Sequence, residues 1–518
     1  MSKKEFIPVT SEIRELIASR LQQEPELSMV AALGFGQNTI VDVVVSRLTR
    51  DSLHDDDHVD RWICEQRLQA RLRTDVVPLD QLDQWARDPS SGNIAHRSGR
   101  FFSITGLAVR HRTEYGELEW DQPIIDQPEI GILGILAKRI NGVLHFCLQA
   151  KEEPGNLHFV QLSPTVQATY SNYTRVHGGS LPPFLAQFME PERSRRLYAK
   201  LQTEDGGRFL FKSNRNMIVL AQDQETNDLP DGFIWLTLRQ IARLVQKDNL
   251  VNACARSVLS SLFGSLRTRA HLRVINAGSD NTLLSEPGRC SCDPQSSVRT
   301  GEREKGERDL AGLDQIIQWL DDMKARNHIF QKRIGLDRLS DWEMDRSGSY
   351  SHKQGKFFKI IGIKVTSQSR EVATWSQPIL DNVGTGIIGL LLRQDGERTS
   401  LLMQAKAEVG NRNIVQIGPT VQFTQENYSD DGRLRKPFLF EEFMRPVRFP
   451  VLQESRQSEE GARFFREEHL HRILLLPEGA ELDVPPEFRW MSLEEVRWFL
   501  LFGEQVNSCA RSILGTLL

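Results

Sequence analysis

The sequence has no long apolar run, few cysteines and little excess charge of either sign. A membrane-spanning helix needs about 20 consecutive apolar residues, and no stretch approaches that length. The opening Met1-Ser2-Lys3-Lys4-Glu5 lacks the apolar core of a secretory signal. A formal net charge of -4 gives no overall attraction to nucleic acid. We therefore expect a cytoplasmic protein that binds neither membranes nor nucleic acid.

The six cysteines are too few for a disulfide framework in a chain of 518 residues. Four of them lie in apolar or helical patterns, which is typical of buried, reduced thiols. The other two, Cys290 and Cys292, lie in a polar segment with no neighbouring His or Cys to complete a set of zinc ligands. We therefore expect no metal site and four buried thiols. These four are Cys64, Cys147, Cys254 and Cys509.

An internal duplication dominates the sequence. The segment QAKEEPGNLHFVQLSPTVQATYSNY (149–173) matches QAKAEVGNRNIVQIGPTVQFTQENY (404–428), and the offset is 404 − 149 = 255. The same offset pairs Trp120 with Trp375 and Asn252–Ser257 with Asn507–Ser512. A repeat of this kind defines the architecture of the chain. Hydrophobic residues at 39% and charged residues at 26% allow each copy an ordinary globular core.

These matches predict four segments. Residues 58–265 form the first repeat and residues 313–518 the second. Residues 266–312 are rich in polar residues and Gly, as a linker is. Residues 1–57 form an added helical arm, in which helical spacing over Ser11–Leu27 follows Ser11 as N-cap.

Patterns within each repeat predict an α+β fold. Residues 313–326 have the apolar spacing of a helix, whereas residues 101–109 and 144–151 alternate as half-buried strands do. Each copy ends with a strand, at Trp235 or Trp490, followed by Thr237 or Ser492 as the N-cap of an apolar-striped helix. The order helix, mixed sheet, helix is typical of the α+β class.

The start of the duplicated block is the densest in chemical groups. Gln149, Lys151 and Glu153 share one face of a strand, because side chains alternate with period two. An amide, a cation and a carboxylate thus come together. Alternating polar residues usually mark a solvent-exposed sheet face, but their survival in both copies favours a ligand site. Gly155 is explained equally well as a turn residue.

Tryptophan and arginine residues supply further candidates. Trp120 and Trp375 are suited to stacking on a base, and equally to packing in a core. Arg256 and Arg511 lie one helical turn after an Asn and could clamp a diphosphate with forked guanidiniums. The alternative for these arginines is a surface salt bridge. Arg208 and Arg463 are further candidates for the same role.

With the block QAKxExGN…VQxxPTVQxTxxNY doubled in one chain, the sequence from about residue 60 to residue 518 resembles the nucleotide-diphosphate-hexose 2,3-dehydratases. The resemblance implies tandem Nudix-like domains in a homodimer. It also implies action on thymidine-diphosphate-4-keto-6-deoxyglucose in deoxysugar biosynthesis, coupled to an NADPH-dependent sugar 3-ketoreductase. One pocket would catalyse and its duplicate would be a relic. No cofactor is expected, because a 4-ketone already acidifies the C3 hydrogen.

Such a dehydration needs a base near C3, a donor or cation on the C4 oxygen and an acid for the departing hydroxyl. Glu153 is the candidate base or acid, Lys151 or Gln149 the oxyanion stabiliser, and Tyr173 the proton donor. The candidate substrate-binding residues follow from the shared motif and its neighbours. They are Trp120, Asn156, Gln161, Thr165, Gln167, Arg256, Trp375, Gln404, Lys406, Glu408, Asn411, Gln416, Thr420, Gln422, Tyr428 and Arg511.

The two copies differ in their ionisable side chains. The first copy has the larger number within the motif block, so we expect the working site there, although the second copy has two histidines of its own. The pairs are Glu152/Ala407, His158/Asn413 and Tyr170/Gln425, and in the opposite sense Asn214/His469 and Asn216/His471.

Two other functions are compatible with the same residues. One is hydrolysis of a sugar nucleotide by a Nudix-type enzyme, but the metal-binding box of those hydrolases is absent from both copies. The other is binding of a sugar nucleotide without catalysis. Metal dependence distinguishes the first, and binding without turnover the second.

Overall fold

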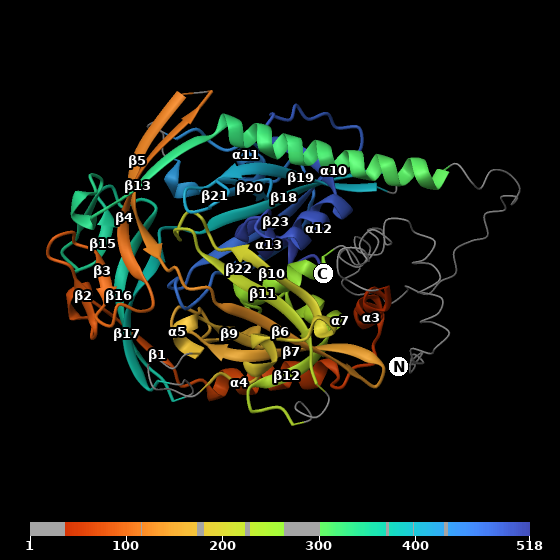
Figure 1. Ribbon diagram of the computed structural model, residues 1–518, viewed down its shortest axis with the longest axis horizontal. Coiled ribbons are helices and arrows are strands. Elements are labelled where there is room, and N and C mark those ends of the chain that lie inside the picture. Colours follow the sequence, from red (N-terminus) through yellow and green to blue (C-terminus); the bar gives the residue numbers. More distant parts are fainter. Residues whose placement is uncertain are drawn as a thin grey trace, which may run out of the picture.

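The computed structural model describes residues 37–114, 116–173, 181–222, 228–263, 301–368, 372–396, 398–428 and 434–518. Within these residues each repeat contains one seven-stranded sheet and several helices, and two five-stranded sheets are built from strands of both repeats. The five-stranded sheets lie together at one end of the molecule, on the left in Figure 1, and the seven-stranded sheets fill the centre. The predicted α+β class is confirmed.

The seven-stranded sheet of the first repeat has the order β10-β11-β6-β7-β12, with β8 beside β7 and β9 beside β6. Its strands pair antiparallel except β11 with β6. β6 and β7 pair with each other over only part of their length. Beyond that part β7 pairs with β8 and β6 pairs with β9, so the sheet divides into two branches. The strands are β6 (Ile132–Ile140), β7 (Val143–Glu152), β8 (Val160–Pro164), β9 (Val166–Ala168), β10 (Arg196–Thr203), β11 (Ser213–Leu220) and β12 (Phe233–Thr237).

The second repeat reproduces this sheet in the order β20-β19-β18-β23-β22, with β21 beside β18 and β24 beside β19. Its parallel pair is β18 with β23. The strands are β18 (Gly386–Asp395), β19 (Arg398–Ala407), β20 (Val415–Gly418), β21 (Val421–Thr424), β22 (Val451–Ser458), β23 (Glu468–Leu476) and β24 (Phe488–Ser492).

Helices pack on the seven-stranded sheets, and two of them begin at the N-cap residues that the sequence predicted. Thr237 and Ser492 each form a capping box with the residue three positions later, Gln240 and Glu495, as the sequence predicted. Helix α3 (Gln37–Leu48) precedes the first repeat. The helices of that repeat are α4 (Asp56–Gln69), α5 (Tyr170–Tyr173), α6 (Ala186–Met189), α7 (Leu238–Leu244) and α8 (Ala253–Leu259). Those of the second are α10 (Gly301–Arg326), α11 (Phe440–Met444), α12 (Leu493–Phe502) and α13 (Ser508–Leu514).

The five-stranded sheets exchange strands between the repeats. β1, from the first repeat, pairs with β16 of the second, and β13, from the second, pairs with β4 of the first. Each small sheet is therefore complete only when both repeats are present. The strands are β1 (Arg73–Val77), β2 (Trp85–Arg87), β3 (Ile94–His96), β4 (Ser103–Thr113), β5 (Gly116–Asp126), β13 (His328–Ile334), β14 (Trp342–Met344), β15 (Tyr350–His352), β16 (Phe358–Thr366) and β17 (Thr374–Asn382).

Some local expectations require correction. Cys64 is exposed, because α4 buries the face that carries Val59 and Ile63 instead. The helix predicted over residues 313–326 begins earlier, at Gly301. The expected helix at Ser11–Leu27 and the cysteine pair at 290 and 292 lie outside the described residues.

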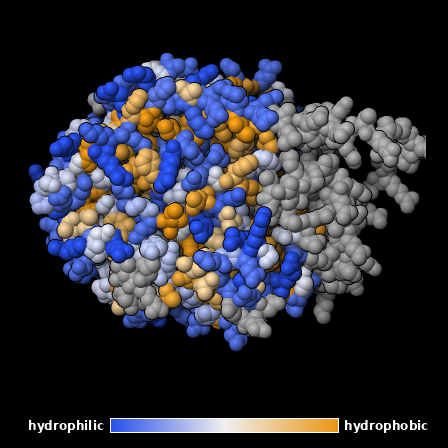
Figure 2. Space-filling model, viewed as in Figure 1, coloured by the Kyte–Doolittle hydropathy of each residue, from blue (hydrophilic) through white to orange (hydrophobic). Residues whose placement is uncertain are grey.

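The face shown in Figure 2 carries mostly hydrophilic residues, with hydrophobic side chains in several separate patches between them. Among the described residues, no helix is both long and apolar enough to span a membrane.

Candidate functional site

A polar cluster occupies the division between β7/β8 and β6/β9 in the first repeat. Lys151 Nζ lies 3.9 Å from Glu153 Oε1 and donates a hydrogen bond of 3.1 Å to the Gln167 carbonyl oxygen. Gln167 Nε2 donates to Glu153 Oε1 at 2.9 Å, and Asn252 Nδ2 donates to Gln167 Oε1 at 3.0 Å. Asn252 also caps α8. The structure thus brings Lys151 and Glu153 together as the alternation predicted, but the amide that bonds Glu153 is Gln167, while Gln149 lies half-buried two positions before Lys151 on β7.

Other residues of the block hold the local structure together. Thr165 and Gln161 were both candidates for substrate binding. The Thr165 hydroxyl donates to the Cys147 carbonyl at 2.5 Å and accepts from the Leu136 N–H. Gln161 Nε2 donates to Ser458 Oγ of the second repeat at 2.7 Å. Because both side chains are buried and engaged with protein groups, they stabilise the site rather than line a pocket.

Two further side chains of the first block have backbone partners. Asn156 Nδ2 donates to the Phe159 carbonyl at 2.9 Å. The Glu152 carboxylate accepts from the N–H groups of Arg71 and Leu72, at 2.9 Å and 2.6 Å, just before β1 begins. The surplus charge of Glu152 in the first repeat therefore serves the local fold.

Arg256 and Arg511 join the repeats across their pseudo-twofold axis. Arg256 Nε donates to Ser512 Oγ at 3.0 Å, and Arg511 Nε donates to Ser257 Oγ at 2.9 Å. Their terminal nitrogens donate to backbone carbonyls, including Ser458 of the other repeat for Arg256. Burial lowers the pKa of Arg256 to about 10. These enclosed guanidiniums serve the interface, not a diphosphate.

The remaining tryptophan and arginine candidates lie around the small sheets. Trp120 and Trp375 each donate from Nε1 to a Gln two positions later, at 3.0 Å, and pack in small apolar clusters. Arg463 of the second repeat stacks 4.3 Å above Phe102 of the first. Arg208 stacks equally on Phe358. These contacts place the two tryptophans and Arg208 against the small sheets. Arg463 also lies near the first site, because burial lowers its pKa and the carboxylates of Glu460, Glu153 and Glu129 oppose that shift.

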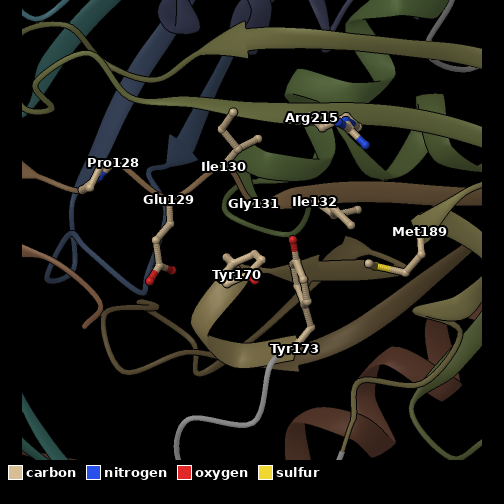
Figure 3. A pocket seen from close by; sticks show the side chains of 9 residues that line it. All are labelled: Pro128, Glu129, Ile130, Gly131, Ile132, Tyr170, Tyr173, Met189 and Arg215. Carbon is tan, nitrogen blue, oxygen red and sulfur yellow. The ribbon is translucent and has the colours of Figure 1, made fainter. Parts of the chain in front are cut away.

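A pocket of about 450 Å³ opens where β9 leads into α5. It is lined by Glu129, Tyr170, Tyr173, Met189 and Arg215, together with backbone at the start of β6. In Figure 3 the Tyr173 hydroxyl points toward Gly131 and Ile132, and the Met189 sulfur points toward Tyr173. Its volume falls in the usual range for small-molecule sites.

The surroundings of the Tyr173 hydroxyl raise its pKa. Burial and the neighbouring Tyr170 raise the pKa of Tyr173, and Glu129 adds to the increase, whereas Arg215 opposes it. A tyrosine carries its proton at neutral pH even without this shift, and the raised pKa makes the Tyr173 hydroxyl a weaker acid than that of a free tyrosine.

A buried lysine lies beside this pocket. Lys212 donates to the Glu129 carbonyl oxygen, and burial lowers the pKa of Lys212 to about 8. The carboxylates of Glu204, Glu460 and Glu129 oppose this shift, and the guanidinium of Arg463 adds to it. The second repeat has Glu467 at the equivalent position.

The equivalent polar cluster of the second repeat is differently bonded. Gln422 Nε2 donates to Glu408 Oε1 at 3.0 Å, and Asn411 Nδ2 donates to Glu408 Oε2 at 2.9 Å. Asn411 also donates to Gln416 Oε1 at 2.9 Å. Thr420 repeats the backbone contacts of Thr165. Glu408 is thereby fixed on both oxygens. Gln404 and Lys406 instead line a separate pocket of about 250 Å³ next to the end of α10.

Aromatic side chains fill the region of the second repeat that corresponds to the first pocket. Phe423 stands where the first repeat has Ala168, and Phe440 lies in a segment one residue longer than its counterpart. The Tyr428 ring packs 6.2 Å from Phe423 and 5.5 Å from Phe440. The polar lining is also replaced there. Gly384, Gln425 and Leu470 stand where the first repeat has Glu129, Tyr170 and Arg215.

Glu129, Arg215, Lys212 and Glu460 were missed by the sequence reasoning. Each lies outside the duplicated block that drew attention. The available signal was a difference in charge or size between the copies, as at Glu129/Gly384 and Lys212/Glu467. A search for identical residues passes over such positions.

Buried charges also meet behind the cluster, where Glu459 and Glu467 flank His469. His469 Nε2 lies 3.5 Å from Glu459 Oε1 and 3.3 Å from Glu467 Oε1. Burial raises the pKa of Glu459 to about 7, although His469 opposes the shift. His471, by contrast, has its pKa lowered by burial and by Arg256.

We expect Glu459→Gln to gain stability relative to wild type as pH rises from 5 to 8. The folded pKa of Glu459 exceeds its ordinary 4.5, so its contribution to stability is full below about pH 4.5 and is lost as pH rises through 7. A neutral Gln does not lose stability in this way. The free energy of unfolding of the variant, relative to wild type, should therefore rise by about 3 kcal/mol, at ~1.4 kcal/mol per pKa unit. Urea unfolding at both pH values measures it. A difference that is equal at pH 5 and pH 8 would contradict the assignment.

Comparison of the sequence with known proteins shows the family of this chain. A sequence model described as NDP-hexose 2,3-dehydratase matches residues 56–262 and 313–517. A dTDP-4-dehydro-6-deoxy-alpha-D-glucopyranose 2,3-dehydratase of Saccharopolyspora spinosa is 37% identical over 88% of this chain and 90% of its own. Enzymes of the same name from Streptomyces violaceoruber and Amycolatopsis orientalis are 38% and 35% identical over 88% of this chain, and over 95% and 88% of their own.

The two matched segments coincide with the two copies found in the sequence, and the relatives extend across both repeats. The chain therefore belongs to the NDP-hexose 2,3-dehydratase family.

Proposed function

We propose that this protein is a hydro-lyase that dehydrates dTDP-4-keto-6-deoxy-D-glucose across C2 and C3, and that the first repeat holds the working site. A base removes the C3 proton, and the electrons of that C–H bond form an enolate with the C4 oxygen. The C2–O bond then breaks, and the hydroxyl leaves as water with one added proton. The resulting 3-enol tautomerises to the 3,4-diketo-2,6-dideoxyhexose nucleotide, so the step balances without a redox cofactor.

The polar cluster of the first repeat and the pocket at the end of β9 together supply groups for each part of this reaction. Glu153 acts as the base at C3, and Lys151, with Gln149 beside it on β7, carries the charge that develops on the C4 oxygen. Tyr173 gives a proton to the departing hydroxyl. Lys151 and Glu153 are almost enclosed, with side chains 9% and 2% exposed, and a water-poor setting strengthens such charge interactions.

The main support for a working site in the first repeat is the difference between the two repeats. In the first, a pocket with ionisable walls opens at the end of β9, the strand that supplies Gln167 to the cluster. In the second, Phe423 and Phe440 pack against Tyr428, and Glu408 is bonded on both oxygens. These differences favour catalysis in the first repeat and a relic in the second.

Several finer features belong to the same proposal. A mixed sheet divided between two strands and covered by helices supports a Nudix-like fold for each repeat. We expect a homodimer and a functional partner that reduces the C3 ketone with NADPH. Because nucleotide sugars and NADPH are cytoplasmic metabolites, the enzyme should act there.

The purified protein is to be incubated with the 4-keto substrate and EDTA, alone and with an NADPH-dependent sugar 3-ketoreductase. The diketo product has an acidic C2 hydrogen next to its anomeric leaving group, so without reductase it should release free dTDP by elimination. With the reductase, a 2,6-dideoxy sugar nucleotide should accumulate instead. Mass spectrometry and anion-exchange chromatography separate these products.

Three other results would contradict the proposal. Substrate that survives unchanged would exclude dehydration of this compound. Formation of dTMP only when magnesium replaces EDTA would favour a hydrolase. Tight binding without turnover would favour a non-catalytic binding protein.

A further inference from the structure

A loop of the second repeat, residues 458–466, covers the polar cluster of the first. Its Gly461 carbonyl accepts from the Gly155 N–H at 2.7 Å, and its Arg466 N–H donates to the Gly155 carbonyl at 2.8 Å. Its Ser458 hydroxyl accepts from Gln161 Nε2 at 2.7 Å. The first repeat therefore meets this loop at Gly155 and at Gln161, both of which follow Glu153 closely in the chain.

This loop brings a second carboxylate to the cluster. Glu460 Oε1 lies 3.5 Å from Gln167 Nε2, whose shorter hydrogen bond of 2.9 Å goes to Glu153 Oε1. Glu460 is also among the charges that act on Cys254, Lys212 and Arg463. Its carboxylate is thus directed into the molecule, beside the first cluster.

The Gln167 amide is held in one orientation by these contacts. Its nitrogen has two hydrogens and faces two carboxylates, and its oxygen accepts from Asn252 Nδ2 at 3.0 Å. A flipped amide would direct its oxygen at both carboxylates and its nitrogen at another donor. A fixed Gln167 in turn fixes the Oε1 atom of Glu153.

At the symmetry-related position beside the second cluster, the acid bonds a backbone N–H instead of the glutamine that corresponds to Gln167. There the equivalent of Glu460 is Asp205, one methylene shorter, and its Oδ1 accepts from the Gly207 N–H at 2.7 Å. Gln422 has Glu408 and Asn507 as partners, which correspond to Glu153 and Asn252. The longer acid is therefore supplied only to the repeat with the open pocket.

We propose that Glu460 is a positioning residue of the first site, and that it acts through Gln167 to hold Glu153 where the C3 proton is removed. This inference rests on the proposed function. It also gives the second repeat a present role, because the working site in the first repeat is completed by a loop that only the second repeat carries.

The test compares three variants of Glu460 in the full-length protein by steady-state kinetics on the 4-keto substrate. Glu460→Ala removes the acceptor for Gln167 and should lower kcat at least tenfold with KM within about twofold, because Glu460 does not touch the substrate. Glu460→Asp should fall similarly, since the shorter chain does not reach. Glu460→Gln keeps an acceptor oxygen and should retain kcat within about threefold.

The matched control is Asp205→Ala, which makes the same truncation in the loop that covers the second cluster. It should lower the melting temperature through loss of the Gly207 contact but leave kcat within about twofold. Equal losses of kcat in Asp205→Ala and Glu460→Ala would overturn the proposal, as would a Glu460→Gln variant as slow as Glu460→Ala, or an unimpaired Glu460→Ala. Absence of dehydration by the wild type would instead refute the proposed function itself.

Discussion

Lys151→Met should lower kcat by at least ~100-fold, because removing one group that stabilises an oxyanion typically costs two to three orders of magnitude. Met has nearly the length of Lys and leaves the strand β7 and its pairing with β8 unchanged. The ammonium group that lies 3.9 Å from Glu153 would be lost. Steady-state kinetics on the 4-keto substrate with the reductase coupled measures the effect.

Lys406→Met is the matched variant in the second repeat. Lys406 occupies the position of Lys151 but lines the separate pocket beside α10, so the variant should keep kcat within about threefold. Inactivity of Lys406→Met with an active Lys151→Met would move the working site to the second repeat. Melting temperatures of both variants distinguish lost chemistry from lost folding.

Gly155→Ala should destabilise the protein by about 3–5 kcal/mol, through steric overlap and loss of hydrogen bonds. A Cβ at this position would overlap the Phe464 carbonyl oxygen and lie 2.7 Å from the Gly461 carbonyl oxygen. Both neighbours are backbone atoms of the covering loop, and Gly155 also binds that loop by two hydrogen bonds. The backbone would therefore have to shift and lose these bonds to make room for a Cβ. Chemical denaturation and soluble yield report the loss.

Gly207→Ala is the control, because the second repeat already has Ala462 at the equivalent position. The nearest atom to a new Cβ there is Asp205 Oδ1 at 3.1 Å, the far end of a side chain. Its stability should change by less than about 0.5 kcal/mol. A Gly155→Ala variant as stable as Gly207→Ala would refute the close approach of the two repeats.

The role of Arg256 and Arg511 could not be predicted from the sequence. Arg256 follows Asn252 by one helical turn, and this spacing is the same for a phosphate clamp and for a buried tie. What decides between them is that α8 and α13 pack against each other at the axis. That packing encloses both guanidiniums among backbone carbonyls of the other repeat. No local pattern encodes it.

The site was predictable to the extent that it is local. Lys151 and Glu153 come together because they alternate on a strand and its continuation, which is a property of the chain over a few residues. Glu460 is 307 positions from Glu153 (460 − 153 = 307) and reaches Gln167, the partner of Glu153, only through the contact between the two repeats. The exchange of β1 and β13 is likewise invisible in the sequence, because any antiparallel edge accepts the same alternation.

The sequence by itself determined the duplication, the α+β class, the capped helices and the family, because each depends on patterns repeated within one copy. Tertiary structure alone decided that the repeats share their small sheets, that Arg256 and Arg511 tie them together, and that Phe423 and Phe440 occupy the space that is open in the first repeat. The physical reason is that burial and steric fit arise from contacts between residues hundreds of positions apart. Hydrophobic periodicity specifies which side of an element is covered but not which partner covers it.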